Sequence, residues 1–196
     1  MKEARLWTEG TDGKVSCHLC NHHCTIAEGK RGFCLVRENR DGRLYSLVYG
    51  RVIARNVDPI EKKPLYHFQP NTRAYSIATP GCNFRCDFCQ NWRISQTSLD
   101  TDFDHIPEVE PEEIVADAVE KGCSSIAHTY TEPTIFMEYA LDVAEMSRER
   151  GLKNVFVTNG FMTSRALEAM DGLIHAANVD LKAFSEKFYR ERCSSE

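Results

Sequence analysis

The chain has 196 residues, of which 42% are hydrophobic and 27% charged, and it carries a formal charge of −5 at pH 7. This composition suffices for a folded core, and the acidic balance argues against a nucleic-acid partner. No apolar run approaches the ~18 residues of a membrane span, and the first residues lack the apolar segment of a secretory signal. We therefore expect a cytoplasmic protein in which the cysteines are metal ligands rather than disulfides, except that Cys123 and Cys193 match neither of the two cysteine groups described below.

The first group of cysteines lies near the N-terminus and consists of Cys17, Cys20, Cys24 and Cys34. Four thiolates would close a coordination shell, so the group favours a structural or electron-transferring metal site over one that activates a substrate. Zinc and an auxiliary iron–sulfur cluster both fit the spacing, and unmetallated thiols in a loop-rich module are the alternative.

Two short apolar runs follow, at 44–49 and 51–55, and each is predicted to be a strand. The segment 58–65 is polar and contains two prolines, which favours a linker. We therefore expect a small cysteine-rich metal-binding subdomain with short strands over residues 1–70, in which a metal supplies stability that so short a segment lacks. Residues 71–196 would form the second domain.

Beyond residue 71 the pattern alternates between strand and helix. Strands are predicted at 74–79, 125–130, 154–158 and 178–181, and helices begin near Asn91, Pro111, Pro133, Ser164 and Ser185. Four β–α units in series predict an α/β fold with a parallel sheet and right-handed crossovers. In such folds the reactive groups gather on loops at the carboxyl ends of the strands.

Each predicted strand is followed by distinctive residues. The first leads into Cys82, Cys86 and Cys89, the second into Glu132, the third into Asn159, and the fourth into Asp180 and Lys182. Glu132 could simply be an acid favoured at a helix N-terminus, and Asn159 with Gly160 could be a turn. Asp180 and Lys182 could form an exposed ion pair at a strand end.

The second group of cysteines has the pattern C-x3-C-x2-C, formed by Cys82, Cys86 and Cys89. A cubane [4Fe–4S] cluster normally takes four thiolates, so three leave one iron with an open position, where chemistry can occur. Zinc with a distant fourth ligand and reduced thiols in a turn are the alternatives. With Phe88 directly before the last cysteine, the pattern resembles the radical S-adenosylmethionine (SAM) superfamily, in which SAM chelates the open iron.

The other motifs narrow this resemblance. The cysteine patterns at 17–24 and 32–34, together with Tyr130–Thr134 and Asp180–Lys182, resemble the AmmeMemoRadiSam-system radical SAM enzymes. These belong to the activating-enzyme branch that contains pyruvate formate-lyase activating enzyme. The resemblance implies reductive cleavage of SAM to methionine and a 5′-deoxyadenosyl radical, which abstracts hydrogen from an unknown substrate. It also implies a low-potential electron donor such as ferredoxin or flavodoxin, and a protein partner or substrate.

The same resemblance gives roles to individual residues. Phe88 would lie against the SAM adenine, Glu132 would receive the SAM ammonium, and Asn159 would contact SAM or the substrate. Asp180 and Lys182 would lie near the SAM ribose and carboxylate.

Radical SAM barrels usually contain six β–α units, whereas about four are predicted here. We therefore expect a partial radical SAM (β/α) barrel, belonging to a fragment of a longer protein, and the fragment's activity on its own is an open question. Two other functions stay under consideration. One is an activase that places a glycyl radical on a partner enzyme. The other is a zinc-stapled binding module or an inactive fragment.

Overall fold

A parallel sheet forms the centre of the computed structural model, which describes residues 1–195. Within these residues a five-stranded sheet has the order β11-β10-β9-β8-β7. Its strands are β7 (Ala54–Pro59), β8 (Arg73–Ala78), β9 (Ser125–His128), β10 (Lys153–Thr158) and β11 (Ala176–Val179). The strands β8 to β11 are parallel, and β7 pairs with β8 in the antiparallel direction. The predicted α/β class with a parallel sheet is confirmed.

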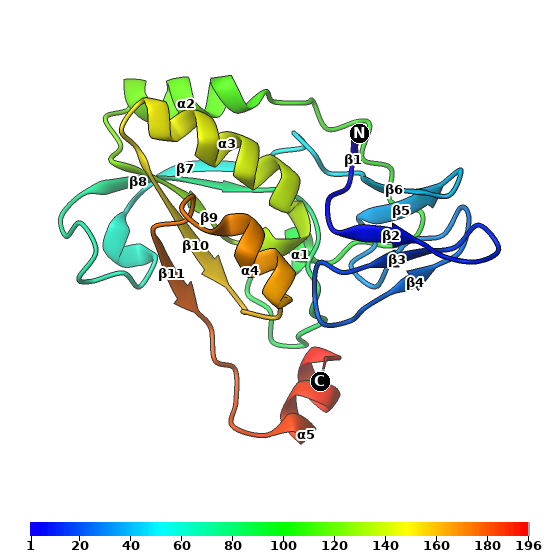
Figure 1. Cartoon of the computed structure of the whole chain (residues 1–196). Helices are drawn as coiled ribbons and strands as arrows, with labels where there is room; N and C mark the ends of the chain where they lie inside the picture. Colours follow the sequence, from blue (N-terminus) through cyan, green and yellow to red (C-terminus); the bar gives the residue numbers. More distant parts are fainter. Residues whose placement is uncertain (196) are drawn as a thin grey trace.

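Two antiparallel sheets of three strands each precede the large sheet. The first, in the order β1-β6-β5, consists of β1 (Lys2–Glu3), β6 (Arg43–Ser46) and β5 (Arg37–Arg40). The second consists of β2 (Trp7–Glu9), β3 (Val15–Cys17) and β4 (Thr25–Ile26). Figure 1 shows both sheets beside the large one, at the end of helix α3.

Helices and helical turns lie between the strands of the large sheet and after β11. They are α1 (Trp92–Ser95), α2 (Pro111–Glu120), α3 (Met137–Glu149), α4 (Ser164–Met170) and α5 (Glu186–Phe188), with 3-10 turns η1 (Ile60–Lys62) and η2 (Pro133–Phe136) and a π-helical turn η3 (Tyr189–Cys193). Figure 1 shows α2 and α3 packed together along one face of the sheet. These connections place the carboxyl ends of β8 to β11 at one edge, as parallel pairing requires.

The sequence explains the local structure of α2. Pro111 occupies its first turn, where the missing N–H costs nothing, and Ile114, Val115 and Ala118 are buried on one face. Val119, which follows Ala118, is exposed.

The prediction of a linker at 58–65 is wrong at its start. β7 extends to Pro59, and η1 follows directly. The predicted strand at 51–55 begins only at Ala54, so the sheet contains a strand that the prolines obscured. Pro59 is tolerated because β7 is an edge strand. The division at residue 70 stays a prediction, although β7 precedes it and pairs with β8 beyond it.

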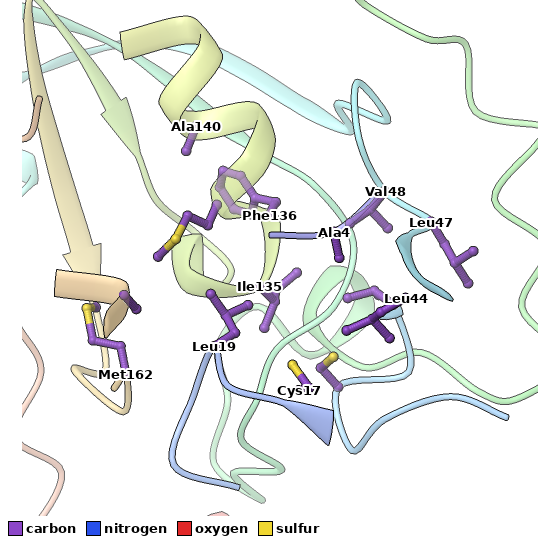
Figure 2. Packing of buried hydrophobic residues seen from close by; sticks show 14 of the residues in the cluster. Ala4, Cys17, Leu19, Leu44, Leu47, Val48, Ile135, Phe136, Ala140 and Met162 are labelled. Carbon is purple, nitrogen blue, oxygen red and sulfur yellow. The ribbon is translucent and has the colours of Figure 1, made fainter. Parts of the chain in front are cut away.

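One hydrophobic core joins the N-terminal sheets to the large sheet. Leu19 and Leu44 of the N-terminal part pack in the same cluster as Ile135, Phe136 and Ala140 of η2 and α3 (Figure 2). The N-terminal residues therefore bury their apolar side chains against the rest of the chain, rather than in a core of their own. A separate cysteine-rich subdomain and a partial barrel both stay expectations.

Candidate functional site

A cavity of about 610 Å³ lies at the carboxyl ends of the parallel strands. Its wall contains the eight residues that the sequence placed around the second cysteine motif: Cys82, Cys86, Cys89, Phe88, Glu132, Asn159, Asp180 and Lys182. These residues come from four loops that are separated by up to a hundred positions, and the parallel sheet brings them together. The volume falls in the range of small-molecule and cofactor sites.

The loop that carries the three cysteines leaves β8 through Gly81. This glycine has φ +103°, and a Cβ placed on it would lie 2.7 Å from Val36 Cγ1, so only glycine fits here. The backbone N–H of Phe84 donates to Cys82 Sγ at 3.3 Å, and Cys89 Sγ lies 3.2 Å from Ser95 Oγ. The loop is therefore held close to the N-terminal part of the chain, with its thiols toward the cavity.

Burial favours the neutral form of two of these thiols, Cys82 and Cys86. Burial raises the pKa of Cys82, and the charge of Glu132 raises it further. Burial also raises the pKa of Cys86 to about 12, with a contribution from a hydrogen bond with Cys193. A positive centre that binds the sulfur atoms would reverse this balance, because metal ligation deprotonates thiols.

Glu132 lies between the cysteines and the tip of β10. It is 2% exposed, and Oε1 accepts hydrogen bonds from Thr134 N (3.0 Å), Thr134 Oγ1 (2.6 Å) and Thr158 Oγ1 (2.6 Å). Oε2 accepts one from Asn159 N at 2.8 Å. Burial raises the pKa of this carboxyl, and these hydrogen bonds act in the opposite direction. The side chain of Glu132 also caps the N-terminus of η2. Glu132 therefore has the role that the sequence analysis gave as the alternative, that of an acid at a helix N-terminus.

The remaining predicted residues differ in their hydrogen bonds and in their exposure. Asp180 accepts a hydrogen bond of 2.7 Å from Lys182 Nζ, and this pair raises the pKa of Lys182 although burial acts to lower it. Asn159 uses both polar side-chain atoms within the chain: Nδ2 donates to Asn83 Oδ1 at 2.7 Å, and Oδ1 accepts from Phe161 N at 3.0 Å. Phe88 is exposed at the rim of the cavity.

Comparison with known protein families identifies the superfamily of the chain. The sequence profile described as the radical SAM superfamily matches residues 76–196, which include the end of β8, the cysteine loop and the strands β9, β10 and β11. The chain belongs to the radical SAM superfamily. Members of this superfamily are in general enzymes that use a [4Fe–4S] cluster and SAM.

Two relatives come from Methanocaldococcus jannaschii. The uncharacterized protein MJ0808 is 46% identical over 197 residues, covering 100% of this chain and 57% of that protein. The uncharacterized protein MJ0674 is 25% identical over 171 residues, covering 85% of this chain and 45% of that protein. The chain thus spans about half the length of the curated relatives that it matches.

A solved structure of TYW1 with a lysine–pyruvate adduct bound is similar over part of its length. It is 21% identical, has a TM-score of 0.39, and the match covers 62% of this chain and 46% of that one.

The residues of this radical SAM chain fit a [4Fe–4S] cluster by their chemistry. Three free thiols line one cavity that also holds acidic and basic groups. Within residues 1–195 no three Cys, His, Asp or Glu side chains are arranged to hold a single metal ion. A cubane differs from a single ion because each thiolate binds a separate iron. A cluster therefore requires that the three thiols line one cavity, and Cys82, Cys86 and Cys89 do so.

Two features in or beside the cavity were not predicted from the sequence. Lys62 and Lys63 also line it, and both donate to Asp58 of β7, at 2.9 and 2.7 Å. Tyr130, at φ +64°, donates to the same carboxylate at 2.5 Å. No pattern in the sequence identified these lysines, because their position depends on the pairing of β7 with β8.

The second missed feature is Cys193, which was expected to match neither cysteine group. It is fully buried and packs against Cys86. Its backbone O accepts from Arg85 N at 2.8 Å, so η3 contacts the cysteine loop directly. Figure 1 shows this C-terminal turn beneath the carboxyl ends of the strands.

The N-terminal cysteines do not line this cavity. Cys17, Cys20 and Cys34 are buried, and Cys24 is half-buried. Among the described helices none is both long and apolar enough to cross a membrane.

Proposed function

We propose that this chain contains the cofactor site of a radical SAM enzyme, in which Cys82, Cys86 and Cys89 hold a [4Fe–4S] cluster. The observation that carries the proposal is that the three thiols and the polar tips of three neighbouring strands line one cavity. The chemistry supplied by a bound cluster and SAM is one-electron reductive cleavage of SAM to methionine and a 5′-deoxyadenosyl radical, which abstracts hydrogen from a substrate. The electron would come from a low-potential donor such as ferredoxin or flavodoxin.

Glu132 is the residue proposed to receive the SAM ammonium. Each oxygen of an ionised carboxylate offers about two acceptor positions. Oε1 is filled by three hydrogen bonds, whereas Oε2 accepts only one and keeps one position. All these donors are neutral, so the buried negative charge has acceptor capacity left for a cation. The hydrogen bonds also fix the orientation of the carboxylate before a ligand arrives.

The other cavity residues are proposed to position the remainder of SAM. Lys182 would pair with the SAM carboxylate and Asp180 with the ribose hydroxyls, since the two lie together at the tip of β11. Phe88 offers an aromatic face for the adenine. Asn159 would act on SAM mainly through Asn83 and Glu132, because its own side-chain atoms are engaged within the chain.

The N-terminal cysteine pattern supports assignment to the AmmeMemoRadiSam type, with a glycyl-radical activase as the alternative. The activity of the whole protein, whether of the AmmeMemoRadiSam type or that of an activase, is proposed as well.

The decisive experiment is anaerobic reconstitution with iron and sulfide, followed by metal analysis and EPR of the dithionite-reduced chain. We expect the EPR spectrum to change on SAM addition, and expect substitution of Cys82, Cys86 and Cys89 by Ala to abolish the SAM-responsive signal. Cys193→Ala and Cys123→Ala are the matched controls, because Cys193 contacts Cys86 without belonging to the motif. The proposal fails if the triple variant keeps a SAM-responsive signal, or if Cys193→Ala removes it.

A further inference from the structure

Two lysines line the cavity on the side of β7, and neither has a role in the proposed binding of SAM. Lys62 ends the turn η1, Lys63 follows it, and both donate to the carboxylate of Asp58. β7 is one edge of the five-stranded sheet, whereas β11, which leads into Asp180 and Lys182, is the other edge. The lysine pair and the Asp180–Lys182 pair therefore reach the cavity from opposite edges of the sheet.

The charges around Asp58 do not cancel. Its Oδ1 accepts a hydrogen bond from Lys62 Nζ, and its Oδ2 accepts from Lys63 Nζ and from the hydroxyl of Tyr130. Tyr130 is neutral, since burial and its bond to Asp58 raise its pKa to about 12. Two ammonium groups thus share one carboxylate, and one positive charge is left in excess at the wall of the cavity.

The ammonium group of Lys63 has donors left over. It carries three N–H donors, and within residues 1–195 the carboxylate of Asp58 is its one hydrogen-bond acceptor. The side chain is only 2% exposed, and Nζ lies 4.6 Å from the centroid of the Tyr130 ring. Burial lowers the pKa of Lys63 more than Asp58 raises it. A buried ammonium of this kind is stabilised by a further acceptor in the cavity, and an anion is the strongest acceptor.

Hydrogen bonds fix the position of this group next to the cysteine loop. The backbone N–H of Lys63 donates to Ile60 O at 2.9 Å, which closes η1. Asn91, which lies two residues after Cys89, donates from Nδ2 to Tyr130 O at 2.7 Å. A ligand bound to the lysines would therefore occupy the same cavity as the proposed cluster and SAM.

We propose that Lys62 and Lys63 bind a carboxylate group of the substrate. The ammonium, carboxylate, ribose and adenine of SAM already have partners in the proposed site, so the lysines are left for the second ligand of the cavity. A carboxylate carries one negative charge and matches the single excess charge, whereas a phosphate monoester carries about −1.5 to −2 at pH 7. Only the identity of the ligand as a substrate rests on the proposed radical SAM function, and the binding of a carboxylate does not.

The first experiment measures carboxylate binding by the full chain without added iron or SAM. Acetate is the probe, and Tm is measured against acetate concentration, with sodium chloride at equal ionic strength as the reference. We expect acetate to raise Tm beyond chloride, because it binds the folded state. Lys62→Gln should weaken acetate binding about 10-fold, since it removes one charge-assisted hydrogen bond. The Lys62 side chain is 66% exposed, and Lys63 and Tyr130 still hold Asp58, so this variant should fold.

The matched control is Lys121→Gln. Lys121 also pairs with an aspartate that accepts from a tyrosine, Asp117 with Tyr75, but it does not line the cavity. This variant should bind acetate as the wild-type chain does. Equal acetate binding in Lys62→Gln and in the wild-type chain would overturn the proposal, and so would tighter binding of inorganic phosphate than of acetate. A failure to assemble the cluster cannot produce either result, because the measurement needs no cluster.

The second experiment separates the substrate from SAM, whose own carboxylate is the competing ligand for the lysines. The reconstituted chain is titrated with SAM and followed by EPR. We expect Lys62→Gln to keep the SAM affinity of the wild-type chain, and Lys182→Gln to lose about 10-fold. The reverse order would assign the SAM carboxylate to Lys62. It would overturn this proposal and leave the radical SAM function standing.

Discussion

The side-chain amide of Asn159 donates a hydrogen bond of 2.7 Å to Asn83 Oδ1, so the tip of β10 holds the loop between Cys82 and Cys86. Asn83 is fully buried, and its own Nδ2 donates to Phe161 O at 3.2 Å. The two asparagines thus connect the end of one parallel strand to the ligand loop that follows another.

Replacing Asn159 by Ala should weaken both the fold and the site. The change leaves the buried Oδ1 of Asn83 without its donor, which costs about 1–3 kcal/mol of the free energy of unfolding. Denaturant unfolding at matched metal content measures this cost. Glu120→Ala, at the exposed end of α2, should change stability by less than about 0.5 kcal/mol. Equal effects of the two substitutions would contradict the role given to the Asn159–Asn83 bond.

Replacing Glu132 by Gln should weaken SAM binding by about 10- to 100-fold, because a hydrogen bond to a charged group contributes about 1.5–3 kcal/mol. Titration of the reconstituted chain with SAM, followed by EPR, measures the affinity. Glu145→Gln on the exposed face of α3 is the control, and it should bind SAM as the wild-type chain does. An unchanged affinity in Glu132→Gln, with the cluster intact, would exclude the carboxylate as the partner of the ammonium.

The convergence of these strand tips could be predicted because parallel pairing is a general rule. Once β8 to β11 were expected to be parallel, Glu132, Asn159 and Asp180 had to meet at one edge of the sheet. The sequence could not show whether each side chain is free to contact a ligand or already forms hydrogen bonds within the chain. Asn159 was expected to contact SAM or substrate, but hydrogen bonds within the chain occupy its amide and its carbonyl oxygen.

Long-range antiparallel contacts were the least predictable part of the fold. The pairing of β7 with β8 places Lys62 and Lys63 at the cavity, yet prolines at 59 and 64 favoured a linker there. The N-terminal sheets have short strands with few apolar residues, which favoured a small independent unit. Their burial against α3 depends on Arg37 and Glu138, which are separated by 101 positions and carry no local signal.

The buried ion pair of Arg37 and Glu138 should stabilise the chain far more than exposed pairs do. Arg37 on β5 contacts Glu138 on α3, both side chains are 2% exposed, and Arg5 N also donates to Glu138 Oε1 at 2.7 Å. Glu138→Ala leaves the guanidinium buried without its partner, which should cost about 3–5 kcal/mol. Glu3→Ala, which removes the exposed pair with Arg43, should cost about 0–1 kcal/mol. Comparable costs in denaturant unfolding would mean that Arg37 finds another partner.

The cluster around Asp58 should make stability depend on pH in the acid range. Burial acts to raise the pKa of Asp58, but hydrogen bonds from Lys63, Tyr130 and Lys62 outweigh it and lower the pKa below its usual range. The donor Tyr130 keeps its proton throughout this range, since burial and the bond to Asp58 raise its pKa to about 12.

The sign follows from the direction of this shift. A carboxyl whose pKa is lower in the folded state contributes stability that is fully present above its unfolded pKa of about 3.9. That contribution is lost as the pH falls below about 4 toward the folded pKa. Asp58→Asn should therefore destabilise the chain at pH 6 by roughly 1–3 kcal/mol, and the difference from wild type should shrink as the pH approaches 3. Denaturant unfolding of both chains across this range gives the difference directly, with Asp100→Asn as an exposed control. A difference that stays constant with pH would mean that the pKa of Asp58 is the same in the folded and unfolded states.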